Sequence, residues 1–196
     1  MRSRIAVLVS GRGSNLKALI DFFSRLGDTA SGEIVAVLSN KADAPALDVA
    51  RGAGIAAASF APDDDGRELG DRLETARADL IVLAGYVKKI PSPLVARYAR
   101  RILNIHPGLL PRHGGAGMYG ARVHEAVIAS GDRESGVTVH LVDDEYDRGP
   151  LIAQWRIPVR DAETAGSLAA RVLRVEHVMY PRVVELVASL TRTGND

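Results

Sequence analysis

Apolar runs and amphipathic segments alternate along the first half of the chain. Nearly continuous apolar runs, typical of parallel strands buried on both faces, are predicted as strands at residues 5–9, 33–38, 55–60, 80–84 and 101–106. Between them apolar residues recur at helical spacing, and helices are predicted at residues 16–23, 45–50, 67–78 and 93–99. This alternation predicts an α/β fold with a mostly parallel central sheet, right-handed crossovers and helices on both faces.

The pattern changes after residue 106. A glycine-rich loop at 113–120 precedes a predicted helix at 123–130. Two strands, 135–142 and 151–157, are expected to pair as a hairpin across an acidic loop. A final helix is predicted from residue 163 to about 190, and Pro181 is expected to kink or split it. Trp155, on the strand before this helix, is expected to lie in the core. Because no linker stands out, we expect a single domain over 1–196, with halves at 1–100 and 101–196.

Composition narrows the class of protein. Apolar residues make up 46% and charged residues 25%, which is ordinary for a globular protein. The net charge is +1 and the basic residues are scattered, which argues against a nucleic-acid partner. The absence of cysteine excludes disulfides, thiolate nucleophiles and cysteine-ligated metals. No apolar run approaches the length of a membrane span and the N-terminus lacks a signal-peptide pattern, so we expect a cytoplasmic protein without a membrane partner.

The first apolar run ends in a glycine turn, Ser10-Gly-Arg-Gly-Ser-Asn15, that leads into a helix. Ser14 or Asn15 is the expected N-cap. Free backbone N–H groups at a helix N-terminus attract anions. The turn lacks the Gly-Lys-Ser/Thr ending of a P-loop, and Leu16 occupies the third glycine position of a dinucleotide-binding fingerprint. A single phosphate, as on a ribose 5-phosphate, fits it better; the alternative is a tight turn whose glycines serve packing alone.

Two polar residues, Asn104 and His106, occur where the apolar run at 101–106 breaks into a turn. Strand periodicity places both on one face, at the strand end where open α/β sheets bind ligands. An Asn amide can donate to an oxyanion, and a protonated His can donate or transfer a proton. Asp147 in the acidic loop is the candidate carboxylate that would raise the His106 pKa. The alternative is a satisfied polar pair at a strand end beside a solvated loop.

The chain contains neither a Gly-x-Ser-x-Gly nucleophile elbow nor a His-Glu-x-x-His zinc motif. We therefore expect no metal site. An enzyme with these candidate residues and no nucleophile of its own would suit a reaction in which the substrate supplies the nucleophile.

The motif Asn104-Ile-His-Pro-Gly-Leu-Leu-Pro111, followed by residues 139–150 and Gln154, resembles the folate-dependent formyltransferase family. The resemblance runs from Ile5 to about Pro181. It implies a Rossmann-like fold and transfer of a formyl group from the co-substrate 10-formyltetrahydrofolate to an amine. Within the family, the chain resembles the members that formylate glycinamide ribonucleotide (GAR), which gives N-formyl-GAR and tetrahydrofolate in purine (IMP) biosynthesis.

The resemblance also implies roles for single residues. Asn104 and His106 would stabilise a tetrahedral oxyanion, while Asp147 would pair with His106, keep it protonated and help to relay a proton. The first half of the chain would bind phosphate, and the second half would carry catalysis and folate binding. The implied GAR-binding residues are Gly13, Ser14, Asn15 and Glu176. The implied folate-binding residues are Arg67, Val87, Lys88, Lys89, Ile90 and Asn104. His140 matches a supporting position, and a cis peptide is implied at Leu110–Pro111.

Three positions depart from the family pattern. Gly108 stands where serine is usual, which should leave the turn intact. Lys88 stands where arginine is common, which removes a bidentate contact. Leu173 stands at an often polar position near the GAR ribose.

Other interpretations compete with this one. In the same family, a formyltetrahydrofolate hydrolase carries an extra N-terminal domain and a methionyl-tRNA formyltransferase carries a basic C-terminal domain, and we expect this chain to have room for neither. A nucleotide-binding module without chemistry would not need Asn104, His106 and Asp147 together. The expected partners are the small molecules GAR and 10-formyltetrahydrofolate, and the chain could be a monomer or a homodimer.

Overall fold

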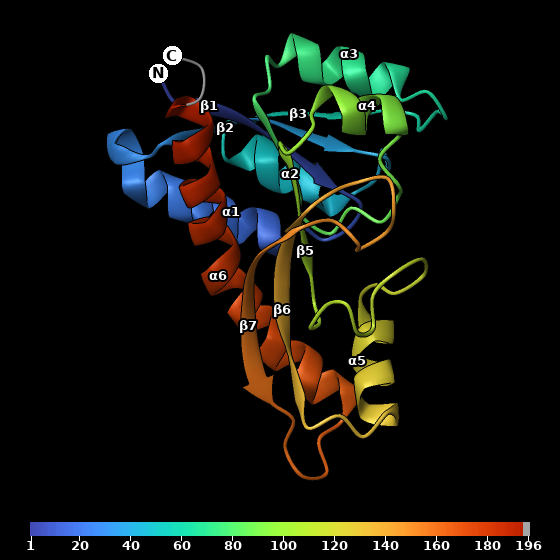
Figure 1. Ribbon diagram of the computed structural model, residues 1–196. Helices are drawn as coiled ribbons and strands as arrows, with labels where there is room; N and C mark the ends of the chain where they lie inside the picture. The colour runs from blue at the N-terminus through green and yellow to red at the C-terminus, as the bar shows by residue number, and fades with distance from the viewer. Residues whose placement is uncertain (194–196) are drawn as a thin grey trace.

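A single seven-stranded sheet runs through the computed structural model, which describes residues 1–193 (Figure 1). The strand order is β3-β2-β1-β4-β5-β6-β7. The first five strands pair in parallel, and β6 and β7 add in antiparallel fashion. The predicted mostly parallel sheet and the predicted hairpin are therefore confirmed. The bounds are β1 (Ser3–Val9), β2 (Gly32–Ser39), β3 (Ala56–Ser59), β4 (Leu80–Leu83), β5 (Ile102–His106), β6 (Glu134–Leu141) and β7 (Leu151–Pro158).

Helices cover both faces of the sheet, as the alternation predicted. One buried apolar cluster joins one face to α1 (Ser14–Leu26), α2 (Pro45–Gly52), α5 (Ala121–Ala129) and α6 (Ala165–Thr193). A second cluster joins the opposite face to α3 (Arg67–Thr75) and α4 (Ser92–Arg97). A short 3-10 turn, η1 (Gly27–Thr29), follows α1. Figure 1 shows α3 and α4 on one side of the sheet and α1 and α6 on the other.

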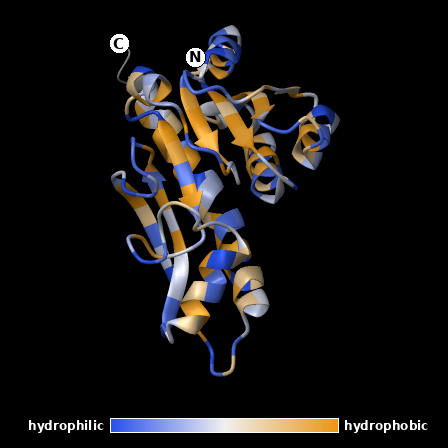
Figure 2. Ribbon diagram, turned by 90° about the vertical axis from the view of Figure 1, so that its right-hand side faces the viewer, coloured by the Kyte–Doolittle hydropathy of each residue, from blue (hydrophilic) through white to orange (hydrophobic). Residues whose placement is uncertain are grey.

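The apolar pattern explains why these segments form these elements. Every residue of β4 is buried, and its side chains divide between the two apolar clusters. The central strands are the most hydrophobic part of the molecule (Figure 2). Helix α1 instead buries a single stripe that contains Leu16, Leu19 and Phe23, because one of its faces meets the sheet and the other meets solvent.

Strand β5 is the point where the sheet changes direction. It pairs in parallel with β4 on one side and antiparallel with β6 on the other. Ile102 packs into the cluster with α3 and α4, whereas Leu103 and Ile105 pack into the cluster with α1 and α6, so the predicted alternation of faces is confirmed. Within the β5–β6 register Asn104 lies opposite His140 and His106 lies opposite Thr138.

The structure corrects three local predictions. Gly13, in a left-handed conformation, precedes α1 as its N-cap, and no side chain caps the helix. Helix α6 continues through Pro181, so of the two outcomes predicted there, a kink or a split, the split is wrong. Trp155 is about half exposed because it lies on β7, the last strand of the sheet. The cis peptide expected at Leu110–Pro111 is present.

Among residues 1–193, no helix combines the length and the apolar character that a membrane crossing would require.

Candidate active site

A cavity of about 630 Å³ opens at the carboxyl ends of β1, β4 and β5, a volume in the range of small-molecule sites. Residues from both halves of the chain line it, so the glycine turn, the β5 motif and the acidic loop meet there. Arg67 is the one predicted site residue outside the lining; it is exposed and lies 3.5 Å from Asp65. The predicted residues that do line the cavity are Gly13, Ser14, Asn15, Val87, Lys88, Lys89, Ile90, Asn104, His106, His140, Asp147 and Glu176.

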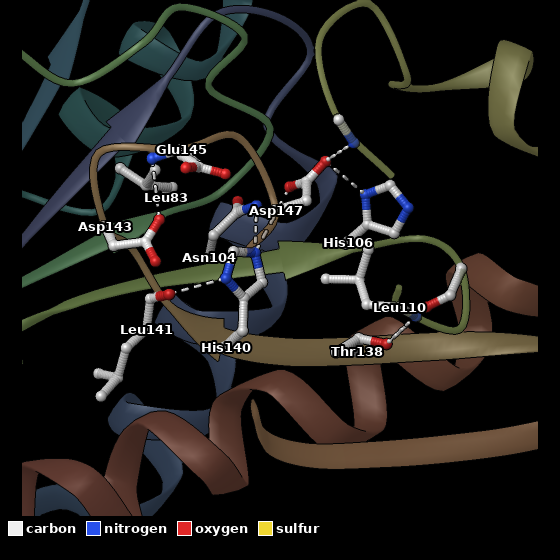
Figure 3. Close-up of polar contacts among 12 residues, drawn as sticks. Leu83, Asn104, His106, Leu110, Thr138, His140, Leu141, Asp143, Glu145 and Asp147 are labelled. Atoms are coloured by element: carbon white, nitrogen blue, oxygen red, sulfur yellow. Dashed lines mark hydrogen bonds and ion pairs between the residues drawn. The ribbon is translucent and has the colours of Figure 1, made fainter. Parts of the chain in front are cut away.

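Asn104 is oriented by His140 on the neighbouring strand (Figure 3). Nδ1 of His140 donates to the carbonyl oxygen of Leu141 at 2.8 Å. In the neutral ring Nε2 is then an acceptor, and it lies 3.1 Å from Nδ2 of Asn104. One amide N–H of Asn104 is thereby held, and the other remains for a ligand in the cavity.

The imidazole of His106 is almost fully buried and is bonded at one nitrogen. Nε2 donates to the carbonyl oxygen of His113 at 2.9 Å, and Nδ1 faces Oδ2 of Asp147 at 3.6 Å. Burial lowers the pKa of His106, and the Asp147 carboxylate and the His113 carbonyl offset this effect only in part. Asp147 acts on the His106 pKa in the expected upward direction, but desolvation of the ring has the larger effect, so this pKa lies below its ordinary value.

Asp147 lies between the two histidine rings (Figure 3). Its Oδ1 is 3.5 Å from Nε2 of His140, and its Oδ2 accepts a hydrogen bond from the backbone N–H of Gly115 at 2.9 Å. Burial alone would raise the pKa of Asp147, but His140 and His106, when their rings are protonated, and the Gly115 N–H outweigh it and hold this pKa below its usual value. Asp147 is thus a carboxylate at neutral pH.

The side chains of Thr138 and Gln154 hold the turn after His106, a role that the sequence did not indicate. Oγ1 of Thr138 donates to the carbonyl oxygen of Gly108 at 2.7 Å and accepts from the N–H of Leu110 at 3.1 Å. Nε2 of Gln154 donates to Oγ1 of Thr138 at 3.0 Å and to the Leu110 carbonyl oxygen at 2.9 Å. The position of Thr138 near the site could have been predicted, because Thr138 lies two residues before His140 on one strand and therefore shares its face.

Gly108 leaves little room for the serine that is usual in the family. A Cβ at this position would lie 3.0 Å from Cγ1 of Val123 and 3.1 Å from Nε2 of His106. The prediction that the departure leaves the turn intact agrees with the hydrogen bonds around it. In this chain the glycine also allows the His106 ring to approach the turn backbone closely.

The glycine turn approaches α2 closely. Gly13 has φ of 81°, and a Cβ there would lie 2.7 Å from Cβ of Ala46. The carbonyl oxygen of Gly11 accepts from the N–H of Ala46 at 3.2 Å. This packing keeps the turn open at the N-terminus of α1, where the N–H groups of Ser14 and Asn15 belong to the first turn and can bind an anion.

Asn15 and Glu176, which are 161 residues apart, form a buried contact. Nδ2 of Asn15 donates to Oε2 of Glu176 at 2.5 Å. Burial raises the pKa of Glu176, and the Asn15 bond lowers it by less. Oδ1 of Asn15 is buried without a partner in the described residues. The contact joins the glycine turn to α6, and it leaves an amide oxygen that a ligand hydroxyl could satisfy.

The segment after β4 forms the wall predicted to contact folate. Ile90 is buried, whereas Val87, Lys88 and Lys89 are exposed toward the mouth of the cavity. Tyr86 is buried against Phe60, and burial raises its pKa to about 12, so it remains a neutral phenol. Apolar and cationic groups therefore lie together on this wall.

Several lining residues escaped the sequence reasoning. Residues 115–120 of the glycine-rich loop and the first residue of α5 line the cavity, although a glycine-rich pattern indicates only flexibility. His124 of α5 is buried and lines the cavity, and its pKa is lowered by burial and by the nearby His106. Tyr146, next to Asp147, could have been found from its place in the acidic loop. Leu173 gives the α6 side of the cavity an apolar surface.

Residues 3–184 match the family described as formyl transferase. Two curated relatives are named phosphoribosylglycinamide formyltransferase. The chloroplastic protein of Vigna unguiculata is 43% identical over 94% of this chain, which spans 60% of that protein's length. The Escherichia coli protein is 41% identical over 94% of this chain and 86% of its own length.

The fold matches solved structures over nearly the whole chain. A phosphoribosylglycinamide formyltransferase from Brucella melitensis superposes with a TM-score of 0.85 at 39% identity, covering 96% of this chain and 97% of that one. One from Anaplasma phagocytophilum gives 0.87 at 38% identity, covering 96% and 87%. Because the family match spans residues 3–184 and relatives about 40% identical cover nearly the whole chain, the chain belongs to the formyl transferase family.

Proposed function

We propose that this chain transfers the formyl group of 10-formyltetrahydrofolate to the amine of GAR, which gives N-formyl-GAR and tetrahydrofolate in purine biosynthesis. One observation carries the proposal: Asn104 and His106 of β5 meet Asp147, from a loop distant in sequence, in a cavity that the glycine turn also lines. The names of the relatives, phosphoribosylglycinamide formyltransferase, support formyl transfer with GAR as the acceptor.

The glycine turn and α6 bind GAR in this proposal. The N–H groups at Gly13, Ser14 and Asn15 hold the phosphate, because the start of α1 concentrates unpaired donors and a positive dipole end there. Glu176 receives the ribose hydroxyls, next to the free Oδ1 of Asn15. Leu173 contacts the ribose through apolar atoms and adds no hydrogen bond.

The wall formed by residues 87–90 binds folate. Tyr86 and Ile90 provide a buried apolar surface suited to a pterin ring, and Lys88 and Lys89 provide cations for the glutamate carboxylates. Lys88 pairs with a carboxylate as a point charge, without the bidentate geometry of an arginine. The lining therefore fits the co-substrate. Arg67 takes no direct part unless its side chain turns toward the cavity mouth.

Asn104 provides the main stabilisation of charge. As the GAR amine nitrogen bonds to the formyl carbon, the carbonyl oxygen becomes an oxyanion, and the amide N–H not used by His140 donates to it. His106 stabilises the same charge when its ring is protonated. Because His140 and the β5–β6 register fix the amide, the donor is already in place before the reaction begins.

Asp147 and His106 move the proton. The amine loses one proton as it forms the new C–N bond, and the folate nitrogen gains one as the old C–N bond breaks. Asp147, a carboxylate at neutral pH, accepts the first proton directly or through water, and His106 delivers a proton to the departing nitrogen. Transfer of a proton from Asp147 to Nδ1 of His106, which lies 3.6 Å from Oδ2 of Asp147, then restores both groups, so atoms and charge balance.

The chain is proposed to work in the cytoplasm as a single functional domain, with residues 1–100 supplying the phosphate turn and residues 101–196 the catalytic residues. The absence of cysteine and of an apolar span in the sequence supports this location.

A formyl-transfer assay with three acceptors tests the proposal. GAR, methionyl-tRNA and water are each offered with 10-formyltetrahydrofolate, and tetrahydrofolate release is followed by absorbance. We expect turnover with GAR that exceeds turnover with water by at least about a hundredfold, because the phosphate turn adds binding energy that water cannot use. Turnover with water alone, or with methionyl-tRNA in preference to GAR, would refute the proposal.

A further inference from the structure

Ser10, the residue directly after β1, is hydrogen-bonded to Asn40 and to the segment 85–87, which lines the cavity. Its backbone N–H donates to the carbonyl oxygen of Gly85 at 3.2 Å. Its Oγ accepts from the N–H of Val87 at 3.1 Å and donates to Oδ1 of Asn40 at 2.6 Å. The side chain is buried, at 6% exposure, and Ser10 is not among the lining residues.

These bonds hold the segment 85–87 at both of its ends. Gly85 has φ of 77°, so the chain turns sharply as it leaves β4, and the Ser10 N–H and Oγ contact the residues on either side of Tyr86. Val87 begins the exposed wall at 87–90, whereas Tyr86 is buried beneath it. Asn40 in turn fixes the rotamer of the Ser10 hydroxyl, because an amide oxygen can only accept and the hydroxyl must therefore donate to it.

We infer that Ser10 is a positioning residue for the folate side of the cavity and that Asn40 acts through it. The inference rests on the proposed function. Its physical basis is that a hydroxyl with its proton committed to Asn40 presents a lone pair to the Val87 N–H. Without Oγ that N–H loses its partner, and the wall at 87–90 becomes free to shift. The glycine turn keeps its own packing against Ala46, so GAR binding is left intact.

The substitution Ser10→Ala tests the inference, because it should change the KM for one substrate and leave kcat and the KM for the other substrate nearly unchanged. We expect the KM for 10-formyltetrahydrofolate to rise about tenfold, while kcat and the KM for GAR change less than about twofold. Isothermal titration with tetrahydrofolate and, separately, with GAR provides a readout that does not depend on turnover: tetrahydrofolate should bind about tenfold more weakly and GAR equally well. Folding is checked by the midpoint of thermal unfolding.

Ser3→Ala is a matched control. Ser3 is also a buried serine on the chain segment of β1, but it lies at the opposite end of that strand, and its Oγ donates to the carbonyl oxygen of Ala188, away from Asn40 and residues 85–87. It should leave all three constants unchanged. Asn40→Ala provides a second variant in case Ser10→Ala folds poorly, and it should raise the folate KM about threefold because the hydroxyl then loses its fixed orientation.

If the unaltered protein, Ser10→Ala and Asn40→Ala all bind tetrahydrofolate equally well, the inference is overturned but the proposed function is not. A rise in the GAR KM as large as the rise in the folate KM would also overturn it, since the effect would then be general. If the unaltered protein binds no tetrahydrofolate, the proposed function fails as well, so the two failures are distinguishable.

Discussion

Oδ2 of Asp147 lies 3.6 Å from Nδ1 of His106, on the side of the ring opposite to the nitrogen that donates to His113. With Nε2 committed as a donor, a proton on Nδ1 makes His106 an imidazolium whose added N–H faces the carboxylate. Asp147 thus favours the charged ring, while burial favours the neutral one and has the larger effect on the His106 pKa. The protonation state of His106 is a balance that one substitution can change.

Asp147→Asn should shift the basic limb of the pH–rate profile toward lower pH. Burial of His106 remains in this variant but the carboxylate is lost, so the His106 pKa falls further. If the imidazolium is the active form, activity is lost as pH rises through that lowered pKa. The measurement is kcat/KM for GAR across the pH range, with kcat expected to fall at least about tenfold.

Asp144→Asn is the matched control for this experiment, because Asp144 lies in the same loop but is exposed and does not line the cavity. Its profile should overlay that of the unaltered protein. An unmoved basic limb in Asp147→Asn would refute the proposed pairing.

Asn104→Ala and His106→Ala should each lower kcat by on the order of a hundredfold or more, which is the usual effect of losing one oxyanion donor. Binding of GAR should persist, because the phosphate turn is unchanged. Steady-state kinetics measure the loss of kcat, and titration with GAR measures whether binding persists. His177→Gln, a histidine on α6 outside the cavity lining, is the control. A loss below about threefold in both variants would place the chemistry elsewhere.

Gly13→Ala should destabilise the protein by about 1–3 kcal/mol, because a left-handed backbone and a close neighbour both oppose a Cβ there. It should also weaken GAR binding, since the turn must shift away from Ala46. Gly11→Ala is the control for stability, because a Cβ at Gly11 meets no atom within 4 Å. Urea denaturation of both variants gives the comparison, and equal free energies of unfolding would contradict the packing argument.

Glu176→Gln should stabilise the protein increasingly as pH rises above 4.5, the ordinary pKa of glutamate. Below that pH the carboxyl is protonated in both the folded and the unfolded chain, so the two proteins should be alike. Above it the unfolded chain releases a proton that the folded chain retains, and the unaltered protein loses up to about 1.4 kcal/mol per pH unit until the raised folded pKa is passed.

Thermal and urea unfolding at several pH values would measure this difference, with Glu125→Gln on the exposed side of α5 as the control. The free energy of unfolding of Glu176→Gln would be compared with that of the unaltered protein at each pH. If this difference does not grow with pH, Glu176 is ionised in the folded state. The same variant should bind GAR more weakly if the carboxyl contacts the ribose.

Much of the fold could be predicted because apolar periodicity is a local property. The runs at β1, β4 and β5 indicated buried strands, and the alternation along β5 placed Asn104 and His106 on one face. The anion-binding role of the glycine turn also followed from local geometry. The identity of the substrates did not; it came from the resemblance to a family.

The remaining features depend on contacts between distant parts of the chain. The cap at Gly13, the bond from Asn15 to Glu176 and the exposure of Trp155 are set by which elements pack together. The direction of the His106 pKa shift could not be predicted either. A neighbouring carboxylate can be guessed from sequence, but the amount of solvent removed from the ring cannot.

The register of β5 against β6 has a practical consequence. Asn104 faces His140 and His106 faces Thr138, so a slip of one residue would turn these polar groups into the core and put Ile105 and Val139 on their face of the sheet. The same strand pairing therefore determines both whether the apolar side chains are buried and whether the Asn104 amide points into the cavity. Titration of catalytic sites in a preparation would therefore count correctly paired molecules, and specific activity would serve as an assay of folding.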